Sequence, residues 1–134
     1  MSDHAGIPFL DTSYLVRYLT NDLPDLAEQA AAVIDHAEAL ILSELALAET
    51  AHSLTTFYDL PRPRVVDALV EIVNRRNIRL LSLPKHLALE ALALCRDSKR
   101  VSITDALLWA QARHAGAPMV WTFDRKFPEL ARTG

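Results

Sequence analysis

The sequence predicts an α/β fold, a three-layer α/β/α sandwich around a central, mostly parallel sheet. Short apolar runs rich in Val, Ile and Phe recur along the chain, as expected for strands covered on both faces. Longer segments with apolar residues at helical spacing lie between them. Gly is scarce, whereas Ala and Leu are abundant, which favours helices. Strands that alternate with helices indicate a parallel sheet with helices on both faces.

Four apolar runs are the expected strands. Each is short, shows no alternation of apolar and polar residues, and is bounded by polar or turn-forming residues. The four runs are Ile7–Leu10, Ala39–Leu42, Ile78–Leu81 and Pro118–Phe123. Trp121 lies inside the last run and Trp109 inside an apolar helical stretch, so both are expected in the core.

Helices are predicted between and after these strands. The segment 24–38 opens with Pro and acidic residues, as first helical turns do, and another helix follows Asp11. The segment 104–115 is followed by Gly116, a common helix stop. The remaining helical segments are 43–57, 63–76 and 84–97. Acids on the outer faces of these helices are expected to be solvated, namely Glu28, Asp35, Glu44 and Glu71.

Composition and charge limit the possible functions. The length suits a single domain, 1–134, with a substantial core, and the net charge of −3 gives no global signal for a nucleic-acid or membrane partner. No apolar run reaches membrane-spanning length, and the first residues do not resemble a signal peptide. The single cysteine, Cys95, cannot form an internal disulfide and is expected in the core. We therefore expect a cytoplasmic protein.

Four carboxylates stand at positions that indicate a common site. Ligands of an open parallel sheet bind beyond the C-terminal ends of its strands, where Asp11 ends the first predicted strand and Asp124 the last. Glu49 and Asp105 have largely apolar neighbours, and an ionised carboxylate buried there without a partner would be costly. Helix capping is the alternative for Asp11 and Asp105. For Glu49 the alternative is a helix edge that faces solvent.

Oxygen ligands gathered at a sheet edge favour a hard divalent cation, Mg²⁺ or Mn²⁺. The five histidines are scattered without zinc-ligand spacing. Such acid clusters support metal-assisted hydrolysis of phosphodiesters, because the cation lowers the pKa of a bound water and orients the phosphate. The cation would also reverse the local negative charge that repels RNA or DNA.

These four acids, in this order, resemble those of the PIN-domain family, and within it the VapC-type toxin ribonucleases. The similarity extends over nearly the whole chain, through "FLDTSYLVRYLTND", "LALAET", "SITDALLWAQAR" and "WTFDRKF". Each piece is a weak motif alone, but the ordered set is specific. The family usually has Asn at the position of Ser13, and many relatives carry an acid at the position of Ser102.

The resemblance implies magnesium-dependent cleavage of single-stranded RNA. Asp11 and Asp105 would be the principal cation ligands. Glu49 would bind the cation directly or through water, and Asp124 would complete the acidic pocket. Hydroxyl groups that would orient these carboxylates or touch phosphate belong to Thr12, Ser13, Thr104 and Thr122. The family also implies a small antitoxin protein that neutralises the toxin, and a homodimer.

Basic residues indicate where RNA would lie. Arg125 and Lys126 directly follow Asp124 and are the candidates for phosphate contact. Other basic clusters are expected at solvated helix ends and turns, namely Arg62 with Arg64, Arg75 with Arg76 and Arg79, and Lys99 with Arg100. Apolar residues of the helix after Asp11 could bind an antitoxin helix or a second subunit, or could pack in the core; they are Tyr14, Val16 and Leu19.

Two other functions remain open. A catalytically silent module would keep the fold, bind RNA or a partner protein, and use the acids as helix caps. A phosphatase or phospho-acceptor domain would use Asp11 as nucleophile. Haloacid-dehalogenase-type enzymes have a second Asp two residues later, where this chain has Ser13, and receiver domains have an adjacent acidic pair that Asp11 lacks.

Overall fold

A computed structural model describes residues 3–98 and 100–130 of the chain. Within these ranges, helices and short strands alternate as the sequence predicts. The helices are α1 (Thr12–Thr20), α2 (Pro24–His36), α3 (Glu44–Thr56), α4 (Arg62–Val73), α5 (Lys85–Arg96) and α6 (Ile103–His114). The strands are β1 (Leu40–Leu42) and β2 (Ile78–Leu80). The helices from α2 to α6 start and end within three residues of their predicted segments, and α1 follows Asp11 as expected.

The two strands form a small parallel sheet in which Leu40 lies opposite Ile78. The extended segment before α1 runs parallel to β1 on its other side. There the N–H of Leu10 donates to the carbonyl of Ile41 and the N–H of Ile41 donates to the carbonyl of Pro8, both over 2.8 Å. This segment was predicted as a full strand, and it forms one bridge. All three residues of β1 are buried, as expected for a central strand.

Three helices begin at a residue whose side chain caps the first turn. Asp11, Ser43 and Ser102 each accept a hydrogen bond from a backbone N–H of the helix that follows. The other helices have proline at the cap or in the first turn, where a missing N–H costs nothing. Local sequence therefore determines where the helices start, and two of the caps directly follow the extended segment and β1.

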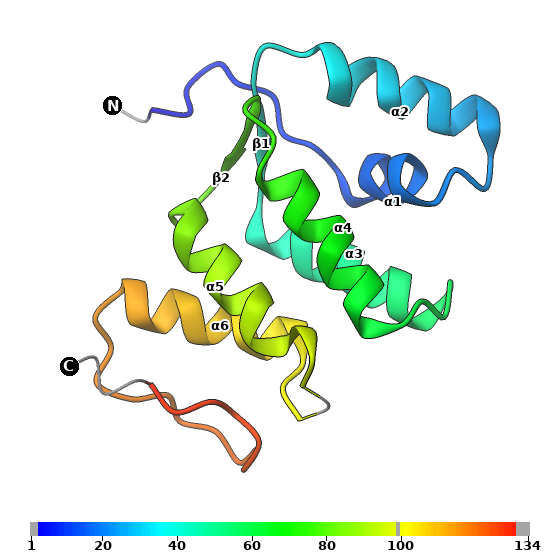
Figure 1. Ribbon diagram of the computed structural model, residues 1–134. Coiled ribbons are helices and arrows are strands. Elements are labelled where there is room, and N and C mark those ends of the chain that lie inside the picture. Colours follow the sequence, from blue (N-terminus) through cyan, green and yellow to red (C-terminus); the bar gives the residue numbers. More distant parts are fainter. Residues whose placement is uncertain (1–2, 99, 131–134) are drawn as a thin grey trace.

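The helices pack in a chain of neighbours. In Figure 1, α1 and α2 lie together at one end of the molecule and α5 and α6 at the other, with α3 and α4 between them. Helix α3 contacts α1, α4 and α6 and therefore lies at the centre of the helix packing. Cys95 is buried in α5, as predicted. No helix in the described ranges has the length and apolar character needed to cross a membrane.

The predicted fourth strand is absent from the described residues. The segment 118–123 has no regular structure, and Met119, Trp121 and Phe123 are exposed. Trp121 is 88% exposed, so the prediction that it lies in the core is wrong, whereas Trp109 is 6% exposed and confirms its prediction. The apolar residues of 118–123 give a strand-like sequence, but no backbone in the described residues pairs with them.

Contacts farther along the chain hold the C-terminal segment against α6. The indole N–H of Trp109 donates to the carbonyl of Glu129 over 2.8 Å, and Phe127 and Leu130 pack against the core. Figure 1 shows this segment, coloured orange to red, running along α6 on the side away from β1 and β2. These contacts keep the segment 118–123 away from the sheet.

Glu44 overturns a further prediction. It was expected on a solvated helix face, but it is only 5% exposed. Its two carboxylate oxygens accept the N–H of Ser82 over 3.2 and 3.0 Å, and Oε2 also accepts the N–H of Leu83 over 2.9 Å. The carboxylate thereby joins the start of α3 to the loop after β2.

Candidate functional site

Asp11 lies where the extended segment beside β1 leads into α1. The hydroxyl of Ser13 donates to its Oδ2 over 2.6 Å, and the N–H of Ser13 donates to the same oxygen over 3.1 Å. These hydrogen bonds, that of the hydroxyl foremost, hold the pKa of the Asp11 carboxyl below its ordinary value. The capping alternative is therefore correct for Asp11, and the same contacts keep an exposed carboxylate ionised and oriented.

Thr12, the residue after Asp11, holds the side chain of Glu49 near Asp11. The hydroxyl of Thr12 donates to Oε2 of Glu49 over 3.3 Å, across the contact between α1 and α3. Glu49 is exposed, as its helix-edge alternative expected. Two of the four predicted carboxylates therefore lie at the same end of the sheet, and the predicted orienting roles of Thr12 and Ser13 each correspond to a hydrogen bond.

Asp105 lies in the first turn of α6, which packs against α3. Its N–H donates to the hydroxyl of Ser102 over 3.0 Å, and its side chain is half-buried. The negative charge is favourable there because the helix dipole is positive at this end. The neighbouring Thr104 is exposed.

Asp124 lies in the C-terminal segment and is exposed. Its Oδ1 accepts the N–H of Lys126 over 2.8 Å, and its own N–H donates to the hydroxyl of Thr122 over 3.0 Å. Since the segment 118–123 forms no strand, the prediction that Asp124 ends the last strand of the sheet is wrong. Arg125 and Lys126 are exposed beside it.

The four carboxylates do not form one compact group. Among residues 3–98 and 100–130, no three His, Cys, Asp or Glu side chains lie close enough to hold one metal ion. The donor chemistry suits Mg²⁺, which is commonly bound by one or two carboxylates together with water and substrate phosphate. Asp11 and Glu49, joined through Thr12, match that smaller requirement. A centre built from all four acids does not fit this structure.

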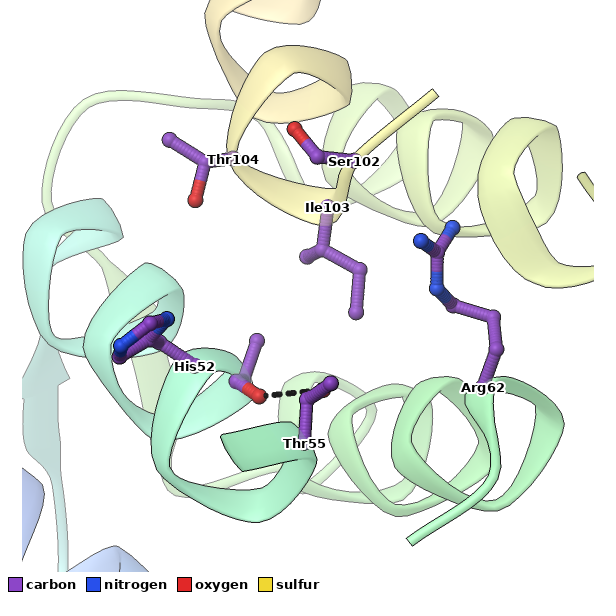
Figure 2. A pocket seen from close by; sticks show the side chains of 7 residues that line it. His52, Thr55, Arg62, Ser102, Ile103 and Thr104 are labelled. Atoms are coloured by element: carbon purple, nitrogen blue, oxygen red, sulfur yellow. Dashed lines mark hydrogen bonds between the residues drawn. The ribbon is translucent and has the colours of Figure 1, made fainter. Parts of the chain in front are cut away.

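A pocket next to these acids was not anticipated from the sequence. It has a volume of about 130 Å³ and lies between α3, the start of α4 and the start of α6 (Figure 2). His52, Arg62 and Thr104 are among the residues that line it. Arg62 was expected to be solvated, but it is half-buried. No local pattern could have revealed this, because the pocket joins three separate helices.

The family is established by comparison with known domains. The model of the PIN domain family matches residues 9–133. No curated protein is a significant match for the chain. The match covers all six helices, both strands and the carboxylates described above. This chain therefore belongs to the PIN domain family, whose fold is of the nuclease type.

Proposed function

We propose that the chain is a divalent-cation-dependent endoribonuclease that hydrolyses phosphodiester bonds of single-stranded RNA. The observation that best supports this proposal is the pair of exposed carboxylates, Asp11 and Glu49, joined through Thr12 inside a PIN domain. The proposed cation is Mg²⁺, with Mn²⁺ as a substitute. The proposed role is that of the toxin in a cytoplasmic toxin–antitoxin pair.

The roles of the residues follow from their contacts. Ser13 fixes the ionised carboxylate of Asp11, and Thr12 orients that of Glu49, so both present oxygens without rearrangement. A bound divalent cation would supply a more acidic water and would stabilise charge on the leaving oxygen. We propose Asp105, in the first turn of α6, as the third carboxylate. It would have to approach Asp11 and Glu49 when the cation binds, because no three such side chains lie close enough in the described residues.

Asp124 is proposed as the fourth carboxylate, with Arg125 and Lys126 as contacts to RNA phosphate. Their participation requires the segment 118–124 to lie beside the extended segment 7–10, which differs from the present arrangement. The segment 7–10 is the outer member of the sheet, since one of its edges pairs with β1 and β1 pairs in turn with β2. Its other edge pairs with no strand in the described residues and could accept the segment 118–124. Thr104 and Thr122 are proposed to contact phosphate or the carboxylate beside each of them.

We propose an apolar groove between α1 and α2 as the binding site of an antitoxin. The groove has a volume of about 230 Å³, and Ser13, Tyr14 and Leu26 are among the residues that line it. Tyr14 and Leu26 are exposed, which suits an apolar helix of a partner protein. Because Ser13 borders both the groove and Asp11, an antitoxin bound there would lie next to the proposed site.

The proposed homodimer would need a different apolar surface. Leu45 and Phe57, at the two ends of α3, are both exposed. By contrast Val16, for which the sequence left both a binding surface and the core open, is buried. We propose these two side chains as contacts with the second subunit.

A silent binding module is the second candidate. It is favoured by the finding that no three carboxylates gather in the described residues, and by the capping of α1 by Asp11. Such a module would bind RNA or a protein without hydrolysis. The phosphatase alternative gains no support from the family to which the chain belongs.

Calorimetric titration of Mn²⁺ tests the proposal, followed by RNA cleavage with and without a chelator. We expect the wild type to bind the cation and to cleave RNA only without chelator, and Asp105→Asn to bind the cation more weakly. Cleavage that persists in chelator would contradict the proposed cation dependence. A folded wild type that neither binds the cation nor cleaves RNA would favour the silent module.

A further inference from the structure

We propose that the pocket between α3, α4 and α6 binds a backbone phosphate of the RNA substrate, next to the phosphate that is cleaved. This inference rests on the proposed ribonuclease function. Figure 2 shows the side chains that face the pocket from three helices. They are His52 and Thr55 of α3, Arg62 of α4, and Ser102, Ile103 and Thr104 at the start of α6.

The size and floor of the pocket suit a small polar group. Its volume is about 130 Å³, whereas one water in the liquid takes about 30 Å³, so the pocket has room for a few heavy atoms. Ala51 and Ile103 are buried beneath it and close the pocket from below. Arg62 can only donate hydrogen bonds, and the hydroxyl and imidazole groups above this floor can donate as well as accept, so the lining can bind an oxyanion.

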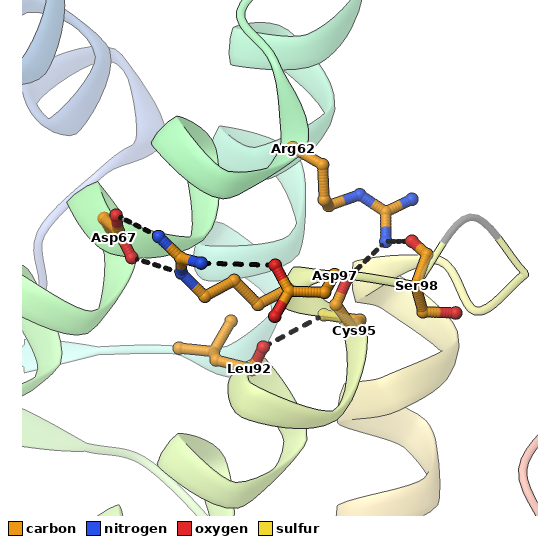
Figure 3. Close-up of polar contacts among 7 residues, drawn as sticks. Arg62, Asp67, Leu92, Cys95, Asp97 and Ser98 are labelled. Carbon is orange, nitrogen blue, oxygen red and sulfur yellow. Dashed lines mark hydrogen bonds and ion pairs between the residues drawn. The ribbon is translucent and has the colours of Figure 1, made fainter.

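Arg62 is the fixed cation of the pocket. Its Nη1 donates to the carbonyls of Cys95, Ser98 and Val101 over 2.9, 3.2 and 2.6 Å. Figure 3 shows the guanidinium held against the connection between α5 and α6. Its Nε and Nη2 donate to no other described residue, so they remain available to a ligand. An arginine that is already immobilised loses little entropy when it binds phosphate.

His52 and Thr104 supply further donors from the exposed rim. Neither side chain makes a hydrogen bond to another residue within the described ranges, and both are exposed. The hydroxyl of Ser102 accepts the N–H of Asp105, which leaves its own proton free to be donated. The pocket therefore offers hydroxyl, imidazole and guanidinium donors from three elements.

The position of the pocket indicates which phosphate it would bind. His52 follows Glu49 by one helical turn on the same face of α3, and Thr104 adjoins Asp105 on α6. An RNA strand whose scissile phosphate lies at the carboxylates can therefore place a neighbouring phosphate in the pocket. A phosphate carried by a strand that also contacts the protein elsewhere has a higher effective concentration at the pocket than free inorganic phosphate, which favours RNA as the ligand.

Negative charge added on the rim tests the pocket without substituting Arg62. We would measure binding of a fluorescein-labelled single-stranded RNA of mixed sequence, in chelator, to the wild type, His52→Glu and Thr104→Glu. His86→Glu is the matched control, because His86 is also exposed, on α5, and lies outside the pocket. Both pocket variants should bind about tenfold more weakly, and their salt dependence should fall by about 0.7 for the lost phosphate contact.

Cleavage kinetics separate the failure of this inference from that of the proposed function. In the presence of Mg²⁺, His52→Glu should raise KM and leave kcat nearly unchanged, since a neighbouring phosphate is bound equally in substrate and transition state. If the wild type cleaves RNA and the two pocket variants behave like the control His86→Glu, the pocket does not bind phosphate, and the ribonuclease proposal is unaffected. A wild type that neither binds nor cleaves the RNA would overturn the ribonuclease proposal and the pocket with it.

Discussion

The hydroxyl of Thr12 lies 3.3 Å from Oε2 of Glu49 and joins the first turn of α1 to α3. The hydrogen bond crosses between two helices that start from neighbouring extended segments of the sheet. It therefore sets the position of Glu49 relative to Asp11, the residue before Thr12. A contact of this kind should matter more for activity than for stability, because both side chains are accessible to water.

Thr12→Val should reduce RNA cleavage by about tenfold to a hundredfold, as found when the partner that orients a metal ligand is removed. Valine has nearly the same shape, so the free energy of unfolding should change by no more than about 1 kcal/mol. Thr12→Ser restores the hydroxyl and should recover most of the activity. Equal activity in the valine and serine variants would show that the hydrogen bond has no role in catalysis.

Asp11→Asn should abolish cleavage while the chain stays folded. Asparagine caps a helix as well as aspartate does, so α1 keeps its first turn. Loss of several kcal/mol of cation-dependent stabilisation corresponds to a fall in kcat/KM of about a hundredfold or more. Urea unfolding and cleavage should be measured together, with Asp25→Asn on the exposed face of α2 as control. Unfolding of Asp11→Asn would identify the carboxylate as structural.

Sequence reasoning succeeded where structure depends on local interactions. Helix positions follow from apolar spacing, and the caps at Asp11, Ser43 and Ser102 lie only two or three residues from the N–H groups that they bind. Both strands lie in runs that the sequence predicts as strands: β1 is entirely buried, whereas β2 is buried at Ile78 and Leu80 with Arg79 exposed between them. Of the candidate site, the structure shows the hydrogen bond by which Thr12, next to Asp11, contacts Glu49, and the site itself stays a prediction.

The remaining features depend on residues far apart in the chain. The segment 118–123 can form a strand only if another backbone pairs with it, and its apolar residues do not indicate whether such a partner is present. Trp121 is therefore exposed although its sequence neighbours are apolar. The burial of Glu44 depends on the N–H groups of Ser82 and Leu83, 38 and 39 residues away. Arg62 is likewise held by carbonyls of a distant loop. Composition gives no sign of such pairings.

Glu44→Gln should lower the free energy of unfolding by about 1–3 kcal/mol, because a charged acceptor of backbone N–H groups is lost and an amide N–H₂ faces those donors. Urea denaturation at neutral pH would measure the change. Glu71→Gln is the matched control, since Glu71 lies exposed on α4. If both substitutions have the same small effect, the carboxylate of Glu44 does not hold the loop after β2.

Acid should weaken the fold partly through Asp22. Hydrogen bonds from Thr20, and then from Tyr58 and Arg17, hold the pKa of the Asp22 carboxyl below its ordinary value. A depressed folded pKa gives stability that is present above the unfolded pKa of about 3.9 and is lost as pH falls through the folded value. The Tm of Asp22→Asn should therefore fall less than that of the wild type as the pH drops below about 4. Tyr58→Phe, which removes one donor, should give an intermediate profile, and parallel profiles for all three proteins would contradict the assignment.

The two tryptophans report separately on the C-terminal segment. Trp109 is buried and bonded to Glu129, whereas Trp121 is almost fully exposed. Trp121→Phe should leave a blue-shifted emission that acrylamide quenches weakly. Trp109→Phe should leave the emission of a tryptophan in water, which acrylamide quenches strongly. The two Stern–Volmer slopes should therefore differ several-fold.

The same fluorescence decides whether Asp124 can join the other carboxylates. If Trp121 is shielded from acrylamide in the free protein, the segment 118–123 packs against another part of the chain, as a fourth strand would require. If Trp121 is exposed to acrylamide in the free protein but becomes shielded when Mg²⁺ and RNA are added, the segment closes on the site during binding. We expect Trp121 of the wild type to become shielded when Mg²⁺ and RNA are added, and Trp121 of Asp124→Asn to stay exposed. In its proposed role the carboxylate of Asp124 must leave the turn that it now forms with Lys126 and move toward the other carboxylates. Exposure that stays unchanged with Mg²⁺ and RNA would limit the site to Asp11, Glu49 and Asp105.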